Sequence, residues 1–342
     1  MDEGKVRSEK DDAGTRPRVC GRYFVFCLLT SVCLPLLLLA CGSAHHSSSG
    51  SQPADDDSGP SWTPMTNPTM AALLSIWGSS ADDVFAVGYD SSGTCVIVHY
   101  DGGAWSPMTS GTQNELYGVW GSSAADVFAV GELGTILHYG GSAWSAMSSG
   151  TTEELYAVWG SAPSDVFAVG TAGVIFRYNG ASWSAMTDTV TTVELYGVGG
   201  NSATDVFAVG ETGTILHYDG SAWSTMASGT TATLWGVWGD GPAGAIAVGF
   251  DASAGAGVTV QYNGASWSAT SIATAGQLVG VWGFSAASAW TVGDDGTILY
   301  FNGAGWTAMT SGISTNLSGV WGSSATDVFA VGDSGVILHY RG

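Results

Sequence analysis

Two side-chain types that could do acid–base or metal chemistry recur along this chain at a regular spacing. Carboxylates occur at Asp83, Asp126, Asp165, Asp205 and Asp327, and imidazoles occur at His99, His138, His217 and His339. Such groups exchange protons or bind a metal when unlike side chains converge at one place. Here each series repeats roughly every 40 residues, which spreads like groups apart. We therefore interpret the aspartates as acceptors for turn N–H groups and the histidines as polar residues packed at the edge of a repeat.

Other signatures of catalysis or of a bound cofactor do not occur in the sequence. It has no HExxH motif, no cysteine–histidine cluster, no Ser-His-Asp order and no Asp-rich calcium loop. The run Asp294-Asp295-Gly296 is too short for such a loop, which leaves only weak binding of Ca²⁺ at the surface open. The sequence thus predicts no catalytic residue, no cofactor and no specific metal site.

The repeated segment itself is the strongest pattern in the sequence. It reads GVWGSSAADVFAVGELGTILHYGGSAWSAM from Gly118 to Met147, and seven near-copies run from Ile76 to the C-terminus. Six copies carry a tryptophan in their first apolar run, and one has Gly199 there instead; the tryptophans are Trp77, Trp120, Trp159, Trp238, Trp282 and Trp321. A second series of seven tryptophans lies in the last apolar run: Trp62, Trp105, Trp144, Trp183, Trp223, Trp267 and Trp306. A residue placed once in each copy usually fills the space between copies. We interpret these tryptophans as packing residues.

Each copy contains four short apolar runs separated by glycine-rich turns. In the second copy the runs are LYGVWG, DVFAVG, GTILHY and AWSAM. Their β-branched and aromatic residues favour strands. Pairs such as Asn179-Gly180 and Asp219-Gly220, between the third and fourth runs, are strong hairpin signals. Four antiparallel strands in every copy predict the blade of a β-propeller.

The two ends of the repeat region favour a closed ring over an open β-solenoid. The last copy stops at Tyr340 without its tryptophan strand, and the segment Ser61-Trp62-Thr63-Pro64-Met65 before the first copy matches the missing piece. A solenoid would need polar capping repeats, whereas a strand that completes the last blade removes both sheet edges. We therefore predict an all-β, seven-bladed propeller over residues 61–342, with residues 61–66 completing the last blade.

The blocks VWGSSATDVFAVG and GTILHYDG resemble the repeats of secreted proteins and lipoproteins of myxobacteria and related bacteria. More loosely, the chain resembles kelch, sialidase-type and photosystem-assembly-factor propellers. Neither the Asp-box of sialidases nor the Gly-His and Trp-Asp pairing of WD40 repeats is matched. The resemblance covers residues 61–342 and implies an architecture without implying an activity.

The N-terminal part has a different composition. Arg16, Arg18 and Arg22 precede an apolar run from Phe24 to Ala40, and Leu38-Leu39-Ala40-Cys41 is similar to a bacterial lipobox. We expect a lipoprotein signal peptide over residues 1–40, a lipid on Cys41, and a flexible tether over 41–60. A plain secretory signal or an uncleaved anchor is the alternative, although the apolar run is short for a membrane span.

The charge of the chain excludes one large class of partner. The formal net charge is −21, no lysine follows Cys41, and the arginines beyond it are Arg177 and Arg341. Such a polyanion repels nucleic acid, and it is disfavoured at anionic lipid surfaces. We therefore expect no nucleic-acid partner and a membrane association that comes only from the lipid on Cys41. The charge fits solubility at a cell surface or attraction of a basic partner.

The repeat symmetry breaks at two places that could mark a ligand-binding face. The connection between the second and third strands is lengthened in the first and fifth copies, where it begins with Tyr89-Asp90 and with Phe250-Asp251. Trp235 replaces the tyrosine of other copies at the start of the inner strand. We treat Tyr89, Asp90, Trp235, Phe250 and Asp251 as the candidate ligand face. Insertions without a function are the alternative interpretation, since surface loops tolerate them.

Together these patterns predict a surface-exposed bacterial lipoprotein whose propeller is a non-catalytic module that binds a protein or a glycan. We expect it in the cell envelope, at the outer membrane or the cell surface. Two alternatives remain open: an extracytoplasmic enzyme that acts on glycans, and a purely structural surface protein. Near-uniform repeats favour a scaffold over a catalyst.

Overall fold

The structure is a computed structural model that describes residues 60–186, 190–241, 244–273 and 276–342. All described residues belong to one compact unit, Asp56–Gly342. The expected signal peptide, Cys41 and the tether up to residue 59 lie outside the described residues. No helix within the described ranges is long and apolar enough to cross a bilayer.

The described residues form seven antiparallel sheets of four strands each. Blade 1 contains β2 (Ala72–Ser80), β3 (Asp83–Tyr89), β4 (Cys95–Tyr100) and β5 (Trp105–Met108). Blade 2 contains β6 (Leu116–Ser123), β7 (Asp126–Gly131), β8 (Ile136–Tyr139) and β9 (Trp144–Met147). Blade 3 contains β10 (Leu155–Ala162), β11 (Asp165–Gly170), β12 (Ile175–Tyr178) and β13 (Trp183–Ala185). Blade 4 contains β14 (Leu195–Ser202), β15 (Asp205–Gly210), β16 (Ile215–Tyr218) and β17 (Trp223–Met226).

The remaining blades follow the same order. Blade 5 contains β18 (Thr233–Gly239), β19 (Ala245–Asp251), β20 (Ala256–Tyr262) and β21 (Trp267–Ile272). Blade 6 contains β22 (Leu278–Ser285), β23 (Ser288–Gly293), β24 (Ile298–Phe301) and β25 (Trp306–Met309). Blade 7 contains β26 (Leu317–Ser324), β27 (Asp327–Gly332), β28 (Ile337–Arg341) and β1 (Ser61–Pro64). Short 3₁₀ turns join the second and third strands of five blades: η1 (Glu132–Gly134), η2 (Thr171–Gly173), η3 (Glu211–Gly213), η4 (Asp294–Gly296) and η5 (Asp333–Gly335).

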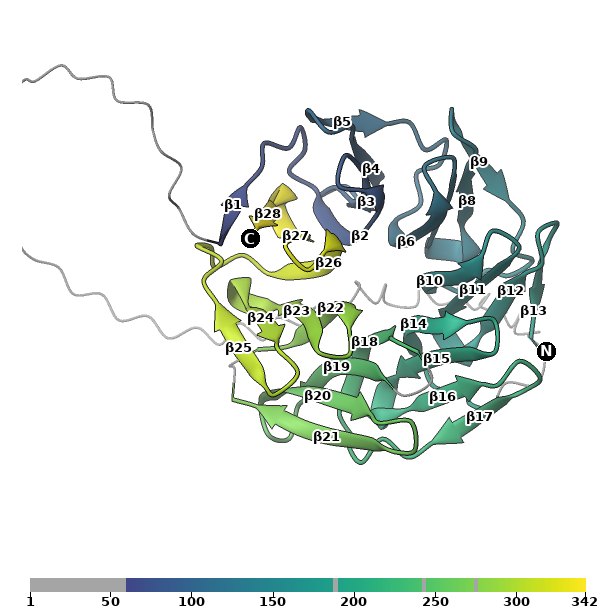
Figure 1. Ribbon diagram of the computed structural model, residues 1–342. Helices are drawn as coiled ribbons and strands as arrows, with labels where there is room; N and C mark the ends of the chain where they lie inside the picture. The colour runs from purple at the N-terminus through teal and green to yellow at the C-terminus, as the bar shows by residue number, and fades with distance from the viewer. Residues whose placement is uncertain (1–59, 187–189, 242–243, 274–275) are drawn as a thin grey trace, which may run out of the picture. The chain divides into compact units, whose positions relative to one another are not determined.

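The sheets are arranged as a ring with the first strand of each blade innermost (Figure 1). Innermost strands contact those of both neighbours, including β2 with β26, so the predicted seven-bladed all-β propeller is confirmed. In blade 7 the strand β1 pairs with β28, with Trp62 opposite Tyr340 and Thr63 opposite His339. The ring thus joins residues from both ends of the repeat region in one sheet.

A tryptophan–glycine contact explains the Trp-Gly pair in the first strand. The ring of Trp77 in blade 1 lies over Gly121 of blade 2, where an added Cβ would stand 2.7 Å from the ring carbons. The same contact joins Trp120 to Gly160. A tryptophan on one blade therefore requires a glycine on the next, because real Cβ atoms do not come so close.

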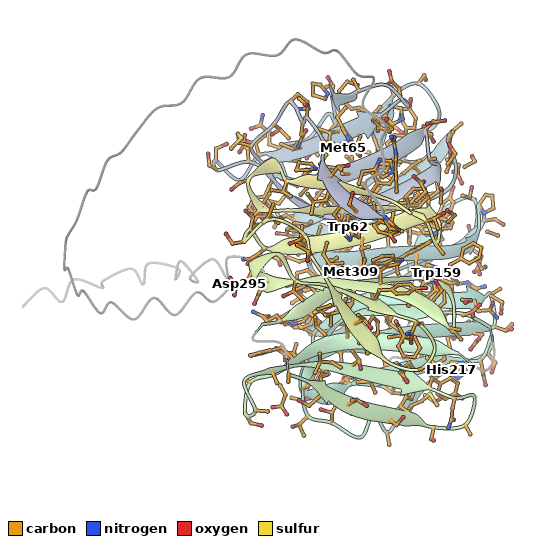
Figure 2. All side chains as sticks on the ribbon, turned by 60° about the vertical axis from the view of Figure 1, so that its left-hand side comes forward. Trp62, Met65, Trp159, His217, Asp295 and Met309 are labelled. Atoms are coloured by element: carbon orange, nitrogen blue, oxygen red, sulfur yellow. The ribbon has the colours of Figure 1, made fainter. Side chains whose placement is uncertain are left out.

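The outer strands pack by a second rule. The tryptophan that begins the fourth strand is buried against a methionine at the end of the fourth strand of the preceding blade: Trp62 with Met309, Trp105 with Met65, Trp144 with Met108, Trp183 with Met147, Trp223 with Met186, and Trp267 with Met226. Trp62 and Met309 are labelled in Figure 2. Methionine is unbranched and fills irregular gaps of this kind. Thr270 replaces the methionine of blade 5.

Candidate functional site

The ring has two different faces because the strands of each blade alternate in direction. One face carries the turns between second and third strands and the connections between blades; in blade 2 these are η1 and residues 148–154. We call it the loop face. The other, the turn face, carries the remaining turns, which in blade 2 are residues 124–125 and 140–143. Asp295 of η4 and His217 of β16 lie at opposite edges of the propeller in Figure 2.

The repeated aspartates and histidines meet each other on the turn face. In blade 2 the hydroxyl of Ser122 donates to Asp126 Oδ2 at 2.5 Å, and His138 Nε2 lies 2.7 Å from Asp126 Oδ1. The His138 ring also packs on Phe128 with 4.6 Å between centroids. We call this arrangement the Ser–Asp–His clasp. It recurs as Ser79–Asp83–His99 in blade 1 and Ser323–Asp327–His339 in blade 7, while Asp165 binds Arg177 in blade 3 and Asp205 binds His217 in blade 4.

The expectation that these aspartates bind turn N–H groups is wrong. In blade 2 the N–H of Ala125 is bound by Ser123 Oγ instead, 3.4 Å away. Asp126 is the first residue of β7 and His138 lies on β8, opposite Phe128. This register brings the imidazole within reach of the carboxylate, which the spacing in the sequence does not show.

The clasp is not a nucleophilic site. The serine hydroxyl donates to the aspartate and not to the histidine, so the histidine cannot act as a base toward it. Each clasp is confined to one blade, and no three His, Cys, Asp or Glu residues in the described part of the chain are close enough to hold a metal ion. In blade 7 burial lowers the pKa of His339 despite the adjacent Asp327. The clasp therefore ties the first three strands of a blade together.

The two lengthened connections on the loop face are extensions of hairpins. Tyr89 pairs with Cys95 at the end of β3–β4, and Phe250 pairs with Gly257 on β19–β20. Asp90 Oδ1 accepts hydrogen bonds from the Ser92 hydroxyl and from the N–H groups of Thr94 and Ser92, and these bonds, the hydroxyl's first, lower the pKa of Asp90. Both acids are therefore used to fold their own turns, since Asp251 does the same in blade 5.

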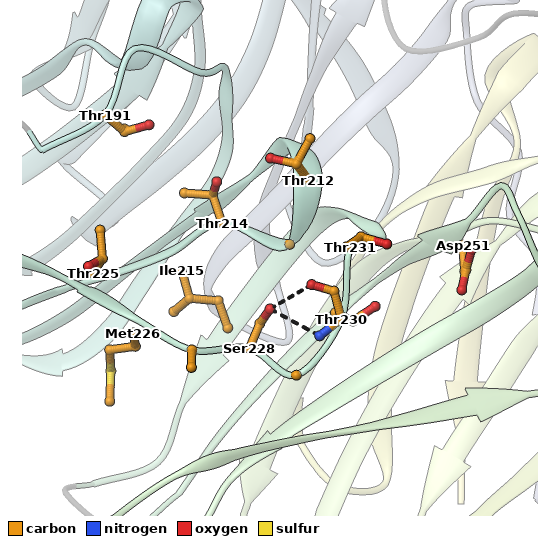
Figure 3. A pocket seen from close by; sticks show the side chains of 13 residues that line it. Thr191, Thr212, Thr214, Ile215, Thr225, Met226, Ser228, Thr230, Thr231 and Asp251 are labelled. Atoms are coloured by element: carbon orange, nitrogen blue, oxygen red, sulfur yellow. Dashed lines mark hydrogen bonds between the residues drawn. The ribbon is translucent and has the colours of Figure 1, made fainter.

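The five predicted residues do not converge on one place. The hairpins of Tyr89 and Phe250 belong to blades 1 and 5, which are not neighbours in the ring. Trp235 lies on β18, next to the β19 strand that carries Phe250. Asp251 borders an open groove of about 740 Å³ (Figure 3). Its lining includes Ile215, Met226 and several threonines.

Trp235 is part of an aromatic row that the sequence interpretation missed. The rings of Tyr117, Tyr156, Tyr196 and Trp235 follow one another at the starts of β6, β10, β14 and β18. Successive ring centroids are 5.7, 5.4 and 4.5 Å apart. We call these four residues the aromatic arc. It spans four adjacent blades at the loop-face mouth of the ring, and Tyr156 and Trp235 are its partly exposed members.

Glutamates accompany each tyrosine of the arc. The hydroxyls of Tyr117, Tyr156 and Tyr196 donate to Glu115, Glu154 and Glu194, at 3.1, 2.9 and 2.5 Å. Glu211 of η3 accepts from Tyr196 at 3.3 Å. Burial, reinforced by these negative charges, raises the pKa of each tyrosine well above its ordinary value. The phenols therefore stay protonated and act as donors.

Neighbouring carboxylates also raise the pKa of Glu154. Burial raises the pKa of Glu154, and the charges of Glu132 and Glu194 add to this effect. On the same face, burial raises the pKa of Asp294 and of Asp333. The mouth therefore concentrates negative charge that a cation would stabilise. The arginines within the described ranges lie elsewhere, on β12 and β28.

Exposed apolar side chains gather on the same face. Met70, Leu133 and Val190 are 80%, 57% and 48% exposed. Met70 and Val190 lie on connections between blades, and Leu133 lies in η1. Among the described residues, one other large apolar side chain, that of Phe284 on the turn face, is similarly exposed. The loop face thus offers acids, aromatic rings and apolar groups together, a mixture typical of interaction surfaces.

A signal for the arc was present in the sequence. Three successive copies begin with Glu-Leu-Tyr, at Glu115, Glu154 and Glu194, while the later copies begin Thr-Leu-Trp, Gln-Leu-Val and Asn-Leu-Ser. The change from acid–aromatic to neutral polar residues follows the ring. This local asymmetry, and not the length of the hairpins, marks where unlike groups converge.

Comparison with known proteins supports the fold. The chain matches a solved structure described as YCF48 bound to D1 peptide with a TM-score of 0.67 and 17% identity, over 82% of this chain and 97% of that one. It matches YCF48 from Cyanidioschyzon merolae with a TM-score of 0.64 and 17% identity, over 82% and 98%. The WD40 propeller domain of Doa1 matches with a TM-score of 0.68 and 10% identity, over 83% and 97%. No family model and no curated protein sequence matches the chain.

Proposed function

We propose that this protein is a non-catalytic binding module whose propeller takes a basic peptide segment at the loop-face mouth. The observation that carries the proposal is the aromatic arc with its glutamates. A lysine or arginine side chain placed there would meet carboxylates and the faces of aromatic rings, and both attract cations. The exposed apolar residues on the same face would contact the rest of a peptide.

Further support comes from charge and from a structural relative. The net charge of −21 steers positively charged partners toward the molecule and away from other polyanions. A protein with the same fold, YCF48, has been solved with a bound peptide. An enzyme is the weaker alternative, because the one recurring set of serine, aspartate and histidine has the wrong hydrogen-bond order for a nucleophile. A purely structural role would leave the asymmetry of the mouth without a purpose.

Removing charge from the mouth tests the proposal. With a fluorescent arginine-rich nonapeptide as the probe, we expect Glu154→Gln combined with Glu194→Gln to weaken binding at least tenfold, measured by fluorescence anisotropy at low salt. The control is Asp82→Asn, which removes an exposed carboxylate on the turn face. Binding should be unchanged there. Equal weakening by both variants, or no binding by the wild type, would contradict a site at the mouth.

The pH dependence of the same binding follows from the raised pKa of Glu154. A carboxylate attracts a cation only when it is ionised, and Glu154 takes up its proton at a higher pH than an ordinary glutamate. Peptide affinity should therefore fall on acidification while ordinary surface carboxylates are still ionised. In the double variant this part of the pH dependence should disappear.

We also propose that the protein is anchored in a bacterial cell envelope by a lipid on Cys41, with the propeller exposed at the surface. The support is the lipobox-like sequence that ends in Cys41 and follows an apolar run. We expect Cys41→Ser to abolish incorporation of a fatty-acid probe and to leave an unprocessed precursor on a gel. Equal labelling of wild type and variant would show that the anchor is not at this cysteine.

A further inference from the structure

A second kind of site lies at the outer rim, where the repeat symmetry fails between blades 5 and 6. A groove of about 440 Å³ runs between β20–β21 of blade 5 and β24–β25 of blade 6. Thr259, Gln261 and Thr270 line one wall, and Phe301 and Trp306 line the other. The groove is separate from the aromatic arc. Its walls come from the third and fourth strands, which are the outer strands of each blade, whereas the arc lies on the innermost strands.

In the other six blades, the positions equivalent to Thr259 and Thr270 hold an apolar pair. Each has an isoleucine on the third strand beside a methionine on the fourth: Ile97 with Met108, Ile136 with Met147, Ile175 with Met186, Ile215 with Met226, Ile298 with Met309, and Ile337 with Met65. Blade 5 has Thr259 directly opposite Thr270. Both members of an apolar cross-strand pair have thus become hydroxyl residues in one blade only.

A third substitution changes the polar group in the same wall. Gln261 takes the place of the histidine or arginine of the clasp, and Gly244 takes the place of its aspartate. The aspartate that holds the histidine or arginine in the other blades is therefore replaced in blade 5 by a residue without a side chain. The amide of Gln261 can both donate and accept hydrogen bonds.

The opposite wall is also exceptional. The tryptophans in the other six copies are buried against a methionine, whereas Trp306 borders Ile272 and is partly exposed. A groove of about 450 Å³ between blades 7 and 1 makes a useful comparison, because Met65 lines it and its His339 is held by Asp327. The two grooves differ in chemistry and not in size.

These groups are uncharged and suit a neutral ligand with both apolar and hydroxyl faces. The C–H face of a pyranose ring packs on an aromatic side chain, and its hydroxyls bind threonine hydroxyls and an amide. None of the lining residues is charged, so an ionic ligand would lose water without gaining a partner. An acidic sugar is further disfavoured by the net charge of −21. We propose that this groove binds one neutral pyranose unit of a glycan, independently of the peptide site at the mouth.

Replacing the two threonines by the isoleucine and methionine of the other blades tests the site. The probes are the methyl pyranosides of glucose, galactose, mannose and N-acetylglucosamine, with glucuronate as the charged counterpart, observed by saturation-transfer NMR. We expect at least one neutral glycoside to bind and glucuronate not to bind. Thr259→Ile with Thr270→Met, the pair found in the other blades, should weaken binding at least tenfold without lowering the melting temperature.

Two further variants keep the test decisive. Gln261→Leu removes the amide at similar volume and should also weaken sugar binding, which covers the case in which the double variant folds poorly. Trp235→Ala alters only the mouth and should leave sugar binding unchanged, so failure of the peptide site does not affect this result. Binding of none of the neutral glycosides, equal binding of glucuronate, or unchanged affinity in both groove variants would overturn the proposal.

Discussion

Replacing Trp62 by alanine should destabilise the propeller more than replacing Trp306, the partly exposed tryptophan at the same position of blade 6. Trp62 is 7% exposed and belongs to β1, the strand that pairs with β28 in blade 7. Its ring makes an edge-on contact with Trp290 and a tilted contact with Tyr340, both with 5.5 Å between centroids. Loss of a large aromatic side chain from a core costs about 3–5 kcal/mol, a large part of the net stability of a typical domain.

The measurement is urea denaturation followed by circular dichroism, which does not depend on the tryptophan removed. Trp306→Ala is the matched control, because Trp306 occupies the same position in blade 6 but is partly exposed. It should cost clearly less. Deleting residues 61–66 should go further, since the free edge of β28 would then be open to pairing with another chain. A Trp62→Ala variant as stable as the control would mean that β1 contributes little to the closed ring.

Gly131→Ala should be severely destabilising although it adds a single methyl group. Gly131 ends β7, next to a bulge in β6 between Leu116 and Gly118. An added Cβ would lie 1.9 Å from the carbonyl oxygen of Glu115 and 2.9 Å from the Cα of Leu116. Both are backbone atoms that cannot rotate away, so the strands must separate. Overpacking usually costs about 1–3 kcal/mol, and we expect a loss of about 3 kcal/mol here.

Gly140→Ala is the control for this change, in the same blade. No atom lies within 4 Å of the position that its Cβ would take, so the free energy of unfolding should stay within about 0.5 kcal/mol of the wild type. Both variants can be measured by urea denaturation with tryptophan fluorescence. Similar stabilities for the two would contradict the idea that backbone contact, and not the flexibility of glycine, explains the repeated glycine at the end of the second strand.

The two proposed sites have one physical origin. A perfectly repeated blade offers like groups at regular positions around the ring, and it cannot bring unlike groups to one place. The arc arises where Glu-Leu-Tyr replaces neutral residues in neighbouring blades, and the rim groove arises where Thr259 and Thr270 replace isoleucine and methionine. Binding chemistry is therefore expected at the departures from the repeat, while the conserved pattern within the repeat serves packing.

Much of the architecture could be predicted from the sequence, because a repeat carries its own strand pattern. Alternating turn residues and β-branched residues define four strands in each copy, and the unmatched segment around Trp62 indicates which strand the last copy lacks. From the spacing we also expect no catalytic constellation built from like residues, and from the charge we expect no nucleic-acid partner. These conclusions depend only on local periodicity and composition, which are properties of the linear chain.

Only the tertiary structure decided which side chains meet. Strand register pairs His138 with Asp126, two residues that the sequence interpretation had treated separately. The closeness of neighbouring inner strands stacks Tyr196 on Trp235 and turns single positions in separate blades into one arc. Asp90 and Asp251, both placed on the candidate ligand face, accept hydrogen bonds within their own turns. The reason is that contacts across strands and between blades depend on register and ring geometry, which no pattern within one copy specifies.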